Sequence, residues 1–323
     1  MKNKYYIIMV LLMALGSCKN EEMEFPDYDM QTVYFAYQSP IRTITMGEDI
    51  FDTSLDNQHR LQIMGTVGGV YSNKENINIG ISVDNSLTQG LTYGSPYSGT
   101  VRPMPANYYT LGSNKIVIPK GSLIGGVDIQ LTDAFFADPL SVGTTYVIPL
   151  TMTDVDQNKT ILQTKKYTLY AVRYINTWQG FYLRRGKDNV VGKAGNAALN
   201  QSIVRHMKYV EQDEVNKINT RSLTQAEFPV VFKVAGGTSI NKTLLLTFDA
   251  NGNCSVAASD ASFTATGTGK FVKRGEKNSW GSQDRDALYL NYQIDLSDRT
   301  INSLDTLVMR DRGVKAETFT PIK

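Results

Sequence analysis

Hydrophobic and polar residues alternate along most of this chain, and helical spacing is almost absent. Successive side chains of a strand point to opposite faces, so the alternation predicts strands with one buried face. Turn-forming residues such as Gly68-Gly69 and Pro119-Lys120-Gly121 separate the runs. In the first half the predicted strands are residues 33–37, 41–46, 60–67, 77–83, 116–118, 127–131, 146–152 and 167–171. About eight short strands within residues 31–172 predict an Ig-like antiparallel β-sandwich.

The second half repeats the strand pattern from a new start. The last alternating run ends near residues 173–177, and Trp178-Gln-Gly-Phe-Tyr182 opens a different pattern, so we place the domain boundary there. Asn251-Gly252 is a hairpin signal, because both residues tolerate positive φ. The predicted strands are residues 181–184, 204–210, 230–234, 244–248, 254–258, 262–266, 271–273, 288–294 and 306–310. Residues 173–323 are expected to form an antiparallel β-barrel or a second sandwich, which makes the fold class all-β.

The first residues have the features of a lipoprotein signal peptide. Lys2 and Lys4 precede an apolar run, residues 7–15, that is far shorter than the roughly 20 residues of a membrane-spanning helix. Leu15-Gly16-Ser17-Cys18 fits the bacterial lipobox, so residues 1–17 are predicted to be removed and Cys18 to be lipidated. The alternative is a secreted protein with a chance cysteine. A lipidated Cys18 holds the protein on a membrane by its lipid alone.

Acidic residues follow the predicted lipidation site. Glu21, Glu22 and Glu24 resemble the export signal of Bacteroidetes lipoproteins that face outward from the outer membrane, which implies a cell-surface location. The other interpretation is a plain acidic tether, because charge runs are usually solvated linkers. Both interpretations make residues 18–30 a polar leash.

Composition narrows the possible partners. With Cys18 lipidated, Cys254 has no partner for a disulfide, so stability must come from core burial. The net charge of +2 gives a nucleic-acid partner no support. Residues 19–172 carry 10 Lys and Arg against 16 Asp and Glu, whereas residues 173–323 carry 21 against 15. The basic second half could attract acidic sugars, or it could dock against its acidic neighbour.

Both halves resemble domains of polysaccharide-utilisation lipoproteins from Bacteroidetes. The first half resembles their N-terminal domain in Val33-Tyr34-Phe35-Ala36, KIVIPKGSLIGGVDIQLTD and YVIPLTM. The second resembles the domain paired with it in FTATGTGKFVKRGEKNSWGSQDRDALYLNYQID and DTLVMRDRGVKAETF. The resemblance implies an Ig-like sandwich near the anchor, followed by a calycin-like barrel of the lipocalin type. It also implies neighbouring surface lipoproteins and an outer-membrane transporter as partners.

The sequence offers no constellation typical of an enzyme, so we expect no catalytic residues. His59 and His206 fall in different predicted domains, so we do not expect them to share a metal or a proton relay. Cys254 follows a hairpin tip and has no basic residue close to it in sequence. We therefore expect a small buried side chain and not a nucleophile. A glycosidase would need two facing carboxylates, and Asp284 with Asp286 is the least implausible pair, although a salt-bridged sheet edge explains both.

One segment begins like a calcium loop and then departs from it. Asp154, Asp156 and Asn158 have the spacing of EF-hand ligands, but Lys159 replaces the required Gly and Lys165 the bidentate Glu. A hairpin turn explains the same residues, so we expect neither a metal nor another cofactor.

Aromatic usage is the strongest functional signal. The chain has 18 Tyr against 12 Phe and 2 Trp, and sugar rings stack on aromatic planes while their hydroxyls meet polar side chains. Trp178 and Trp280 could instead be core residues that close a barrel end. The aromatic and polar candidates for glycan contact are Trp280, Gln283 and Asp284 in one loop, Trp178, Tyr182 and Arg184 at a strand start, and Tyr93, Tyr97, Tyr108 and Tyr109 in the first half.

The function predicted first is a non-catalytic glycan-binding lipoprotein, displayed on the cell surface beside an outer-membrane polysaccharide importer. Its ligand would be a polysaccharide or oligosaccharide, held by weak single sites that gain avidity on a crowded membrane. The alternative is a structural or adhesion lipoprotein whose β-domains recognise proteins. Clustered aromatics in a concave site would favour a glycan, whereas a flat apolar patch or an unpaired strand edge would favour a protein.

Overall fold

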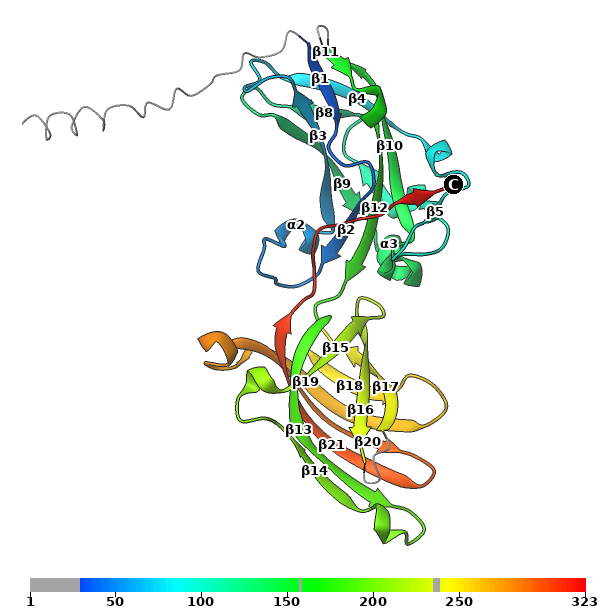
Figure 1. Cartoon of the computed structure of the whole chain (residues 1–323), viewed down its shortest axis with the longest axis vertical. Coiled ribbons are helices and arrows are strands. Elements are labelled where there is room, and N and C mark those ends of the chain that lie inside the picture. Colours follow the sequence, from blue (N-terminus) through cyan, green and yellow to red (C-terminus); the bar gives the residue numbers. More distant parts are fainter. Residues whose placement is uncertain (1–29, 157–158, 235–238) are drawn as a thin grey trace, which may run out of the picture.

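The computed structural model describes residues 30–156, 159–234 and 239–323, and it consists of an upper and a lower group of strands (Figure 1). The predicted signal peptide, Cys18 and the acids behind it lie outside the described residues. Two short α-helices, α2 (Ser54–Asn57) and α3 (Asp133–Ala137), interrupt the strands. Within the described ranges no helix is long and apolar enough to cross a membrane. The all-β prediction is confirmed.

The N-terminal domain folds as a sandwich whose two layers are joined by β8. One layer contains β1, β3, β7 and β9, and the other contains β2, β4, β10 and β12; β8 pairs with both β4 and β9. All eight predicted strands are present. The bounds are β1 (Gln31–Phe35), β2 (Pro40–Thr45), β3 (Arg60–Gly68), β4 (Ile77–Val83), β5 (Thr92–Tyr93), β6 (Arg102–Pro103), β7 (Tyr109–Leu111), β8 (Lys115–Ile118), β9 (Ile124–Leu131), β10 (Tyr146–Val155), β11 (Lys159–Ile161) and β12 (Tyr167–Ile175).

Most of these pairings are antiparallel, but three are parallel. They join β1 to β11, β2 to β12 and β6 to β10. The core between the layers buries one face of each strand, as the alternation predicts, with Ile63 and Ile129 from one layer against Ile79 and Leu150 from the other.

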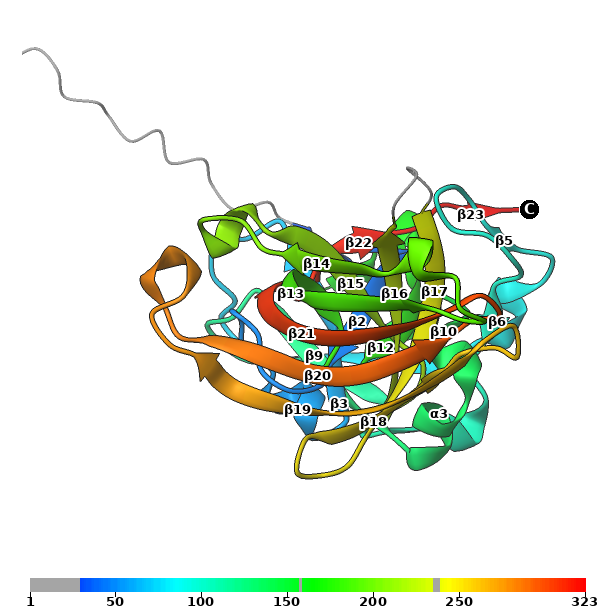
Figure 2. The same cartoon turned by 90° about the horizontal axis from the view of Figure 1, so that it is seen from below.

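The C-terminal domain is a closed antiparallel barrel, seen from its far end in Figure 2. Eight strands follow one another around the wall, and β13 closes the barrel by pairing with β21; β14 adds a further strand to β13. Of the two predicted architectures, a barrel or a second sandwich, the structure has the barrel. The bounds are β13 (Gly180–Gly192), β14 (Gln201–Arg205), β15 (Glu214–Thr220), β16 (Gln225–Lys233), β17 (Ser239–Phe248), β18 (Asn253–Ala258), β19 (Thr264–Glu276), β20 (Arg285–Asp295) and β21 (Arg299–Asp311).

Three predicted strands in this half differ from the structure, and one strand was missed. The run 204–210 is not one strand, because β14 ends at Arg205 and the chain turns until β15 begins at Glu214. Strand β15 itself was missed because two of its three inward side chains, Asn216 and Thr220, are polar. The runs 262–266 and 271–273 are parts of the single strand β19.

The last residues of the chain return to the N-terminal domain. Strand β22 (Glu317–Thr318) pairs with β2, and β23 (Pro321–Ile322) pairs with β5. Figure 1 shows this red segment running from the barrel up along the sandwich. Phe319 is 6% exposed and packs with Ile41, Val147 and Leu169 on the outer face of the second layer. We predicted that residues 173–323 form one domain. The strands β22 and β23 instead pair with strands of the N-terminal domain.

Arg312 links the two domains where the barrel ends. Its side chain is largely buried, and it donates hydrogen bonds to four backbone carbonyls. Two of them belong to the N-terminal domain, Met46 and Glu48, and the other two to the connecting segment, Asn176 and Gln179. Lys273 and Arg274 add ion pairs to Glu48 across the same boundary, at 2.8 and 3.2 Å. The tail and these contacts hold barrel and sandwich together.

Candidate functional site

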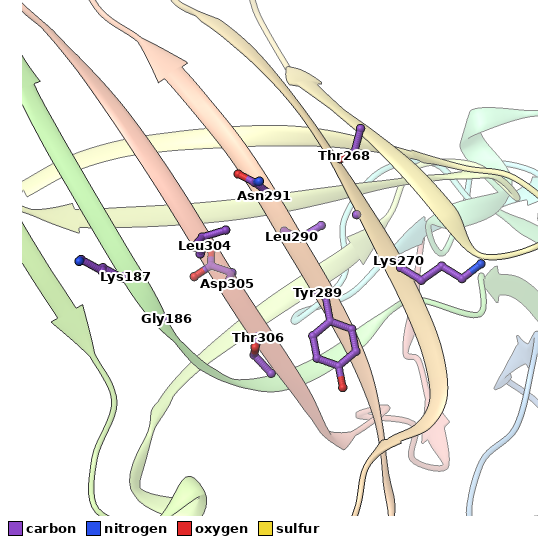
Figure 3. Close-up of a pocket in the computed structure, with 11 residues that line it drawn as sticks. Gly186, Lys187, Thr268, Lys270, Tyr289, Leu290, Asn291, Leu304, Asp305 and Thr306 are labelled. Carbon is purple, nitrogen blue, oxygen red and sulfur yellow. The ribbon is translucent and has the colours of Figure 1, made fainter.

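Four neighbouring strands of the barrel, β13, β21, β20 and β19, carry outward side chains in register (Figure 3). Their pairing lines up two rows that cross the strands, and a shallow groove of about 560 Å³ lies over both rows. We call this the outer groove. The first row is Lys187, Leu304, Asn291 and Thr268, and the second is Thr306, Tyr289 and Lys270.

The outer groove combines one aromatic ring with several hydrogen-bonding groups. The Tyr289 hydroxyl donates to Glu276 Oε1 at 2.7 Å. Burial and this hydrogen bond raise the pKa of Tyr289 to about 12, so the phenol is neutral at physiological pH. In the described part of the chain, neither Lys187 nor Asn291 uses its side chain in a hydrogen bond or ion pair. These groups are free to meet a polar ligand beside the ring.

Aliphatic surface adjoins the polar groups of the groove. Leu304 is 55% exposed in the first row, and Val204 on β14, which pairs with Lys187, is 62% exposed. Exposed aliphatic side chains next to donors suit a ligand with both C–H and hydroxyl surfaces.

The predicted loop site around Trp280 lies at the end of β19, just beyond Glu276. The guanidinium carbon of Arg285 lies 3.6 Å from the Trp280 ring centroid, and the indole N–H donates to the carbonyl of Met309 at 3.1 Å. The indole is therefore half-buried, with Arg285 over its ring. Gln283 is exposed, and Asp284 pairs with Lys277 at 2.9 Å. The structure thus places Trp280, Gln283 and Asp284 in one loop.

The other predicted aromatic group lies inside the barrel. The ring of Trp178 stacks on Phe248 with centroids 4.0 Å apart, as a core residue would. Tyr182 is fully buried and donates to the carbonyl of Trp178 at 2.7 Å. Arg184 is 1% exposed and faces the barrel interior. Trp178 is partly buried and the other two are fully buried, so Arg184 could meet a ligand only from within the barrel.

Other candidates from the sequence have structural partners. Tyr93 is buried against Phe319, and the Tyr97 hydroxyl donates to Glu317, so both hold the C-terminal tail. The Tyr108 hydroxyl donates to Asp138. Tyr109 is half-buried against the sandwich core.

The carboxylate candidates have structural partners, and His59 and His206 lie in different domains. Asp286 accepts from the backbone N–H of Arg274 at 2.8 Å, while Asp284 is held by Lys277. Asp156 accepts from the backbone and side chain of Asn78, at 2.6 and 3.0 Å, and Asn158 lies outside the described residues. Across residues 30–156, 159–234 and 239–323, no group of three or more acidic, His or Cys side chains is placed to hold a metal.

Sequence reasoning missed the residues of the outer groove. A signal exists in the predicted strand 288–294, where the outward positions Tyr289 and Asn291 are an aromatic and an amide. The signal could not be used from sequence, because strand register decides which residues of β13, β19 and β21 lie beside them.

Fold and groove together define a two-domain all-β protein with a groove across four strands of its barrel. One family model, the domain of unknown function DUF5627, matches residues 177–313, and another, described as a "-like, N-terminal domain", matches residues 28–159. A crystal structure of a Bacteroides ovatus protein of unknown function is 40% identical, with a TM-score of 0.85, and the match covers 92% of this chain and 99% of that chain. The chain belongs to the same family as that protein.

More distant structures also come from Bacteroides. A second Bacteroides ovatus protein of unknown function is 13% identical, with a TM-score of 0.42, over 90% of this chain and 99% of that one. An auxiliary nutrient binding protein from Bacteroides thetaiotaomicron VPI-5482 is 14% identical, with a TM-score of 0.41, over 83% and 90%. Likenesses at these TM-scores carry no functional argument. No curated protein matches the sequence.

Proposed function

We propose that this protein is a non-catalytic, glycan-binding lipoprotein of the cell surface, accessory to an outer-membrane polysaccharide uptake system. The outer groove carries the proposal, because it sets the Tyr289 ring among the free side chains of Lys187 and Asn291. A sugar ring can lie on the aromatic face while its hydroxyls bond to the amide and ammonium groups. The groove crosses several strands, as a site for a chain-like ligand should.

The order of the domains supports display away from a membrane. Figure 1 shows β1, which follows the predicted tether, at the end of the sandwich farthest from the barrel. A lipid on Cys18 would then leave the sandwich as a spacer and the groove on the distal domain. Weak binding at each groove would be offset by avidity where many copies share one membrane.

The glycan proposal is tested by affinity electrophoresis of a soluble chain, residues 19–323, in gels that contain single polysaccharides. We expect at least one polysaccharide to retard the wild type, and Tyr289→Ala and Asn291→Ala to migrate faster in that gel. Tyr37→Ala is the matched control, because Tyr37 is 66% exposed on the other domain. If no polysaccharide retards the wild type, the glycan proposal is wrong. Release of reducing ends from the retarding polysaccharide would contradict the non-catalytic part.

The location is tested separately in cells. We expect labelled fatty acid to enter the wild type but not Cys18→Ser, and protease added to intact cells to digest the wild type. If the wild type incorporates no label and the protease does not digest it, the proposed lipidation and surface location are wrong.

A protein partner is the second candidate function, and the edge strand β14 favours it. Within the described ranges β14 pairs with β13 alone, so its other edge is open. Val204, Met207 and Tyr209 in and after this strand are 62%, 53% and 50% exposed. An open edge beside exposed apolar side chains is a common place for a second chain to add.

A further inference from the structure

Four charged side chains form a cluster inside the barrel. Arg184 Nε donates to both carboxylate oxygens of Asp305, at 3.2 and 3.1 Å, and neither side chain has exposed surface. Arg205 donates to Asp188 at 2.7 and 2.8 Å and to Asp305 at 2.6 Å. The hydroxyl of Tyr292 also donates to Asp305, at 2.8 Å. We call Arg184, Asp188, Arg205 and Asp305 the interior cluster.

The cluster has spare donors and occupied acceptors. Asp188 accepts from Ser303 as well as from Arg205, so both of its oxygens are occupied, as are both oxygens of Asp305. A guanidinium group has only donors. Among the described residues nothing accepts a hydrogen bond from Nη1 of Arg184 or Nη1 of Arg205, and both atoms are buried. A group that completes this cluster must bring acceptor oxygens.

An opening in the barrel wall leads to the cluster. After Arg184, strand β13 changes its partner from β15 to β14, while β16 pairs with β15 only at Ala226 and Glu227. A cavity of about 410 Å³ lies between β14 and the far part of β16, and Arg184, Asp188 and Arg205 line its inner side. This volume is within the range of small-molecule sites.

The rim of this opening adds a lysine, a histidine and two acids to the lining of the cavity. Lys233 and His206 line the rim, as do the acids Asp213 and Glu214. Asp213 already accepts from the side chain of Arg185 and from the backbone N–H of Met207, both at 2.6 Å. Glu214 and Lys233 bring one negative and one positive charge to the same rim.

A gain in fold stability does not by itself explain why these charged side chains are buried. Burial of two ion pairs costs desolvation that their attraction often fails to repay, and apolar residues of similar volume commonly stabilise as well or better. The guanidinium carbon of Arg184 lies 5.5 and 5.7 Å from the ring centroids of Phe228 and Phe232, so its surroundings are otherwise apolar. Burial lowers the pKa of Arg184, but Asp305 and Tyr292 raise it above its usual value, so the cation persists.

We propose that the barrel holds a second ligand site, in which Nη1 of Arg184 and Nη1 of Arg205 bind the carboxylate of a sugar acid that enters between β14 and β16. Arg205 is the one member of the cluster on an edge strand, so it can turn aside to admit the ligand without opening the closed wall. Paired guanidinium donors favour a carboxylate over a hydroxyl, because a carboxylate adds an opposite charge and offers two oxygens that accept at once. This site is separate from the outer groove, and its choice of a sugar acid among carboxylates rests on the proposed glycan function.

Isothermal titration calorimetry of the soluble chain tests the site with four probes: D-glucuronate, D-galacturonate, D-glucose and D-galactose. We expect at least one uronate to bind at least tenfold more tightly than its neutral parent sugar. Arg205→Gln should weaken that binding at least tenfold. Arg221→Gln is the matched control, since the Arg221 side chain is 43% exposed on the barrel surface and pairs with Glu227, and the variant should bind as the wild type does.

Circular dichroism of each variant shows whether it folds. If Arg205→Gln does not fold, Lys233→Gln at the rim takes its place and should weaken uronate binding about threefold. Equal affinity for uronate and parent sugar, absence of binding to the wild type, or unchanged binding in a folded Arg205→Gln would each overturn the proposal. Tyr289→Ala should leave uronate binding unchanged; a loss there would assign the ligand to the outer groove and also overturn it.

Discussion

The ring of Phe319, four residues before Lys323, packs against the ring of Tyr93 with centroids 4.7 Å apart and planes inclined at 58°. Phe319 follows the barrel in sequence, but it completes a small core on the sandwich. The N-terminal domain therefore needs residues that lie more than two hundred positions away along the chain.

Phe319→Ala should destabilise the N-terminal domain by about 3 kcal/mol, because it empties a buried aromatic site. Urea unfolding followed by tyrosine fluorescence measures the loss. Ile322→Ala is the control, since Ile322 is 49% exposed, and it should change stability by less than about 0.5 kcal/mol. Equal effects of the two substitutions would show that the tail does not dock through Phe319.

Arg312→Met should lower stability by about 2 to 4 kcal/mol, because four carbonyls lose a charged donor in a largely buried place. The single unfolding transition expected of the wild type should also separate into two, since this residue joins the domains. Differential scanning calorimetry detects both changes. Arg310→Gln, whose side chain is exposed and pairs with Asp311, should behave as the wild type.

Alkaline pH should destabilise the protein between about pH 10 and pH 12. The pKa values of Tyr146, Tyr174 and Tyr289 are each raised to about 12, chiefly by burial. Unfolded tyrosine has a pKa of about 10, so the stabilisation is complete below that pH and disappears as pH rises through the folded values. Thermal melting at a series of pH values, with tyrosinate absorbance, measures it. Constant melting temperature from pH 9 to 12 would contradict this prediction.

Cys254 should react slowly with iodoacetamide in the folded protein. The thiol is buried, and burial raises its pKa to about 12, so little thiolate is present at neutral pH. In the chain of residues 19–323 it is the single cysteine, and mass spectrometry then counts one label. Labelling in 8 M urea is the positive control. Equal rates in buffer and urea would mean that the strand carrying Cys254 is open.

Tyr289→Phe should bind a polysaccharide nearly as well as the wild type does, whereas Tyr289→Ala should bind it about 3- to 10-fold more weakly, the size of an aromatic contact. The phenol hydroxyl is already used by Glu276, so the ring face is what remains for a sugar. Affinity electrophoresis at several polysaccharide concentrations gives the ratio. A large effect of the Phe substitution would mean that the hydroxyl, not the ring, meets the ligand.

Sequence patterns predicted the strands well where the buried face is apolar throughout. The runs at residues 77–83 and 146–152 became β4 and β10, since inward isoleucines and leucines mark one face. The pattern failed for β15, where Asn216 and Thr220 point inward. Polar side chains at inward positions of a strand hide the alternation on which the method depends.

The residues predicted to contact a glycan also fall into two groups, one positioned by local geometry and one by tertiary contacts. Trp280, Gln283 and Asp284 are neighbours in sequence and stay together in one loop, because short-range geometry suffices. Trp178, Tyr182 and Arg184 were grouped by proximity along the chain, but their inward position on the barrel decides their role. The outer groove draws on four strands, and only their pairing shows which side chains meet.

The sequence by itself determined the all-β class, the restart of the pattern near Trp178 and the Asn251-Gly252 hairpin, because each depends on residues within a few positions. Only the tertiary structure decided that the second domain closes as a barrel, that Arg184 meets Asp305 and Arg205 inside it, and that Phe319 returns to the sandwich. Strand register and closure depend on contacts between distant residues, which local alternation does not encode.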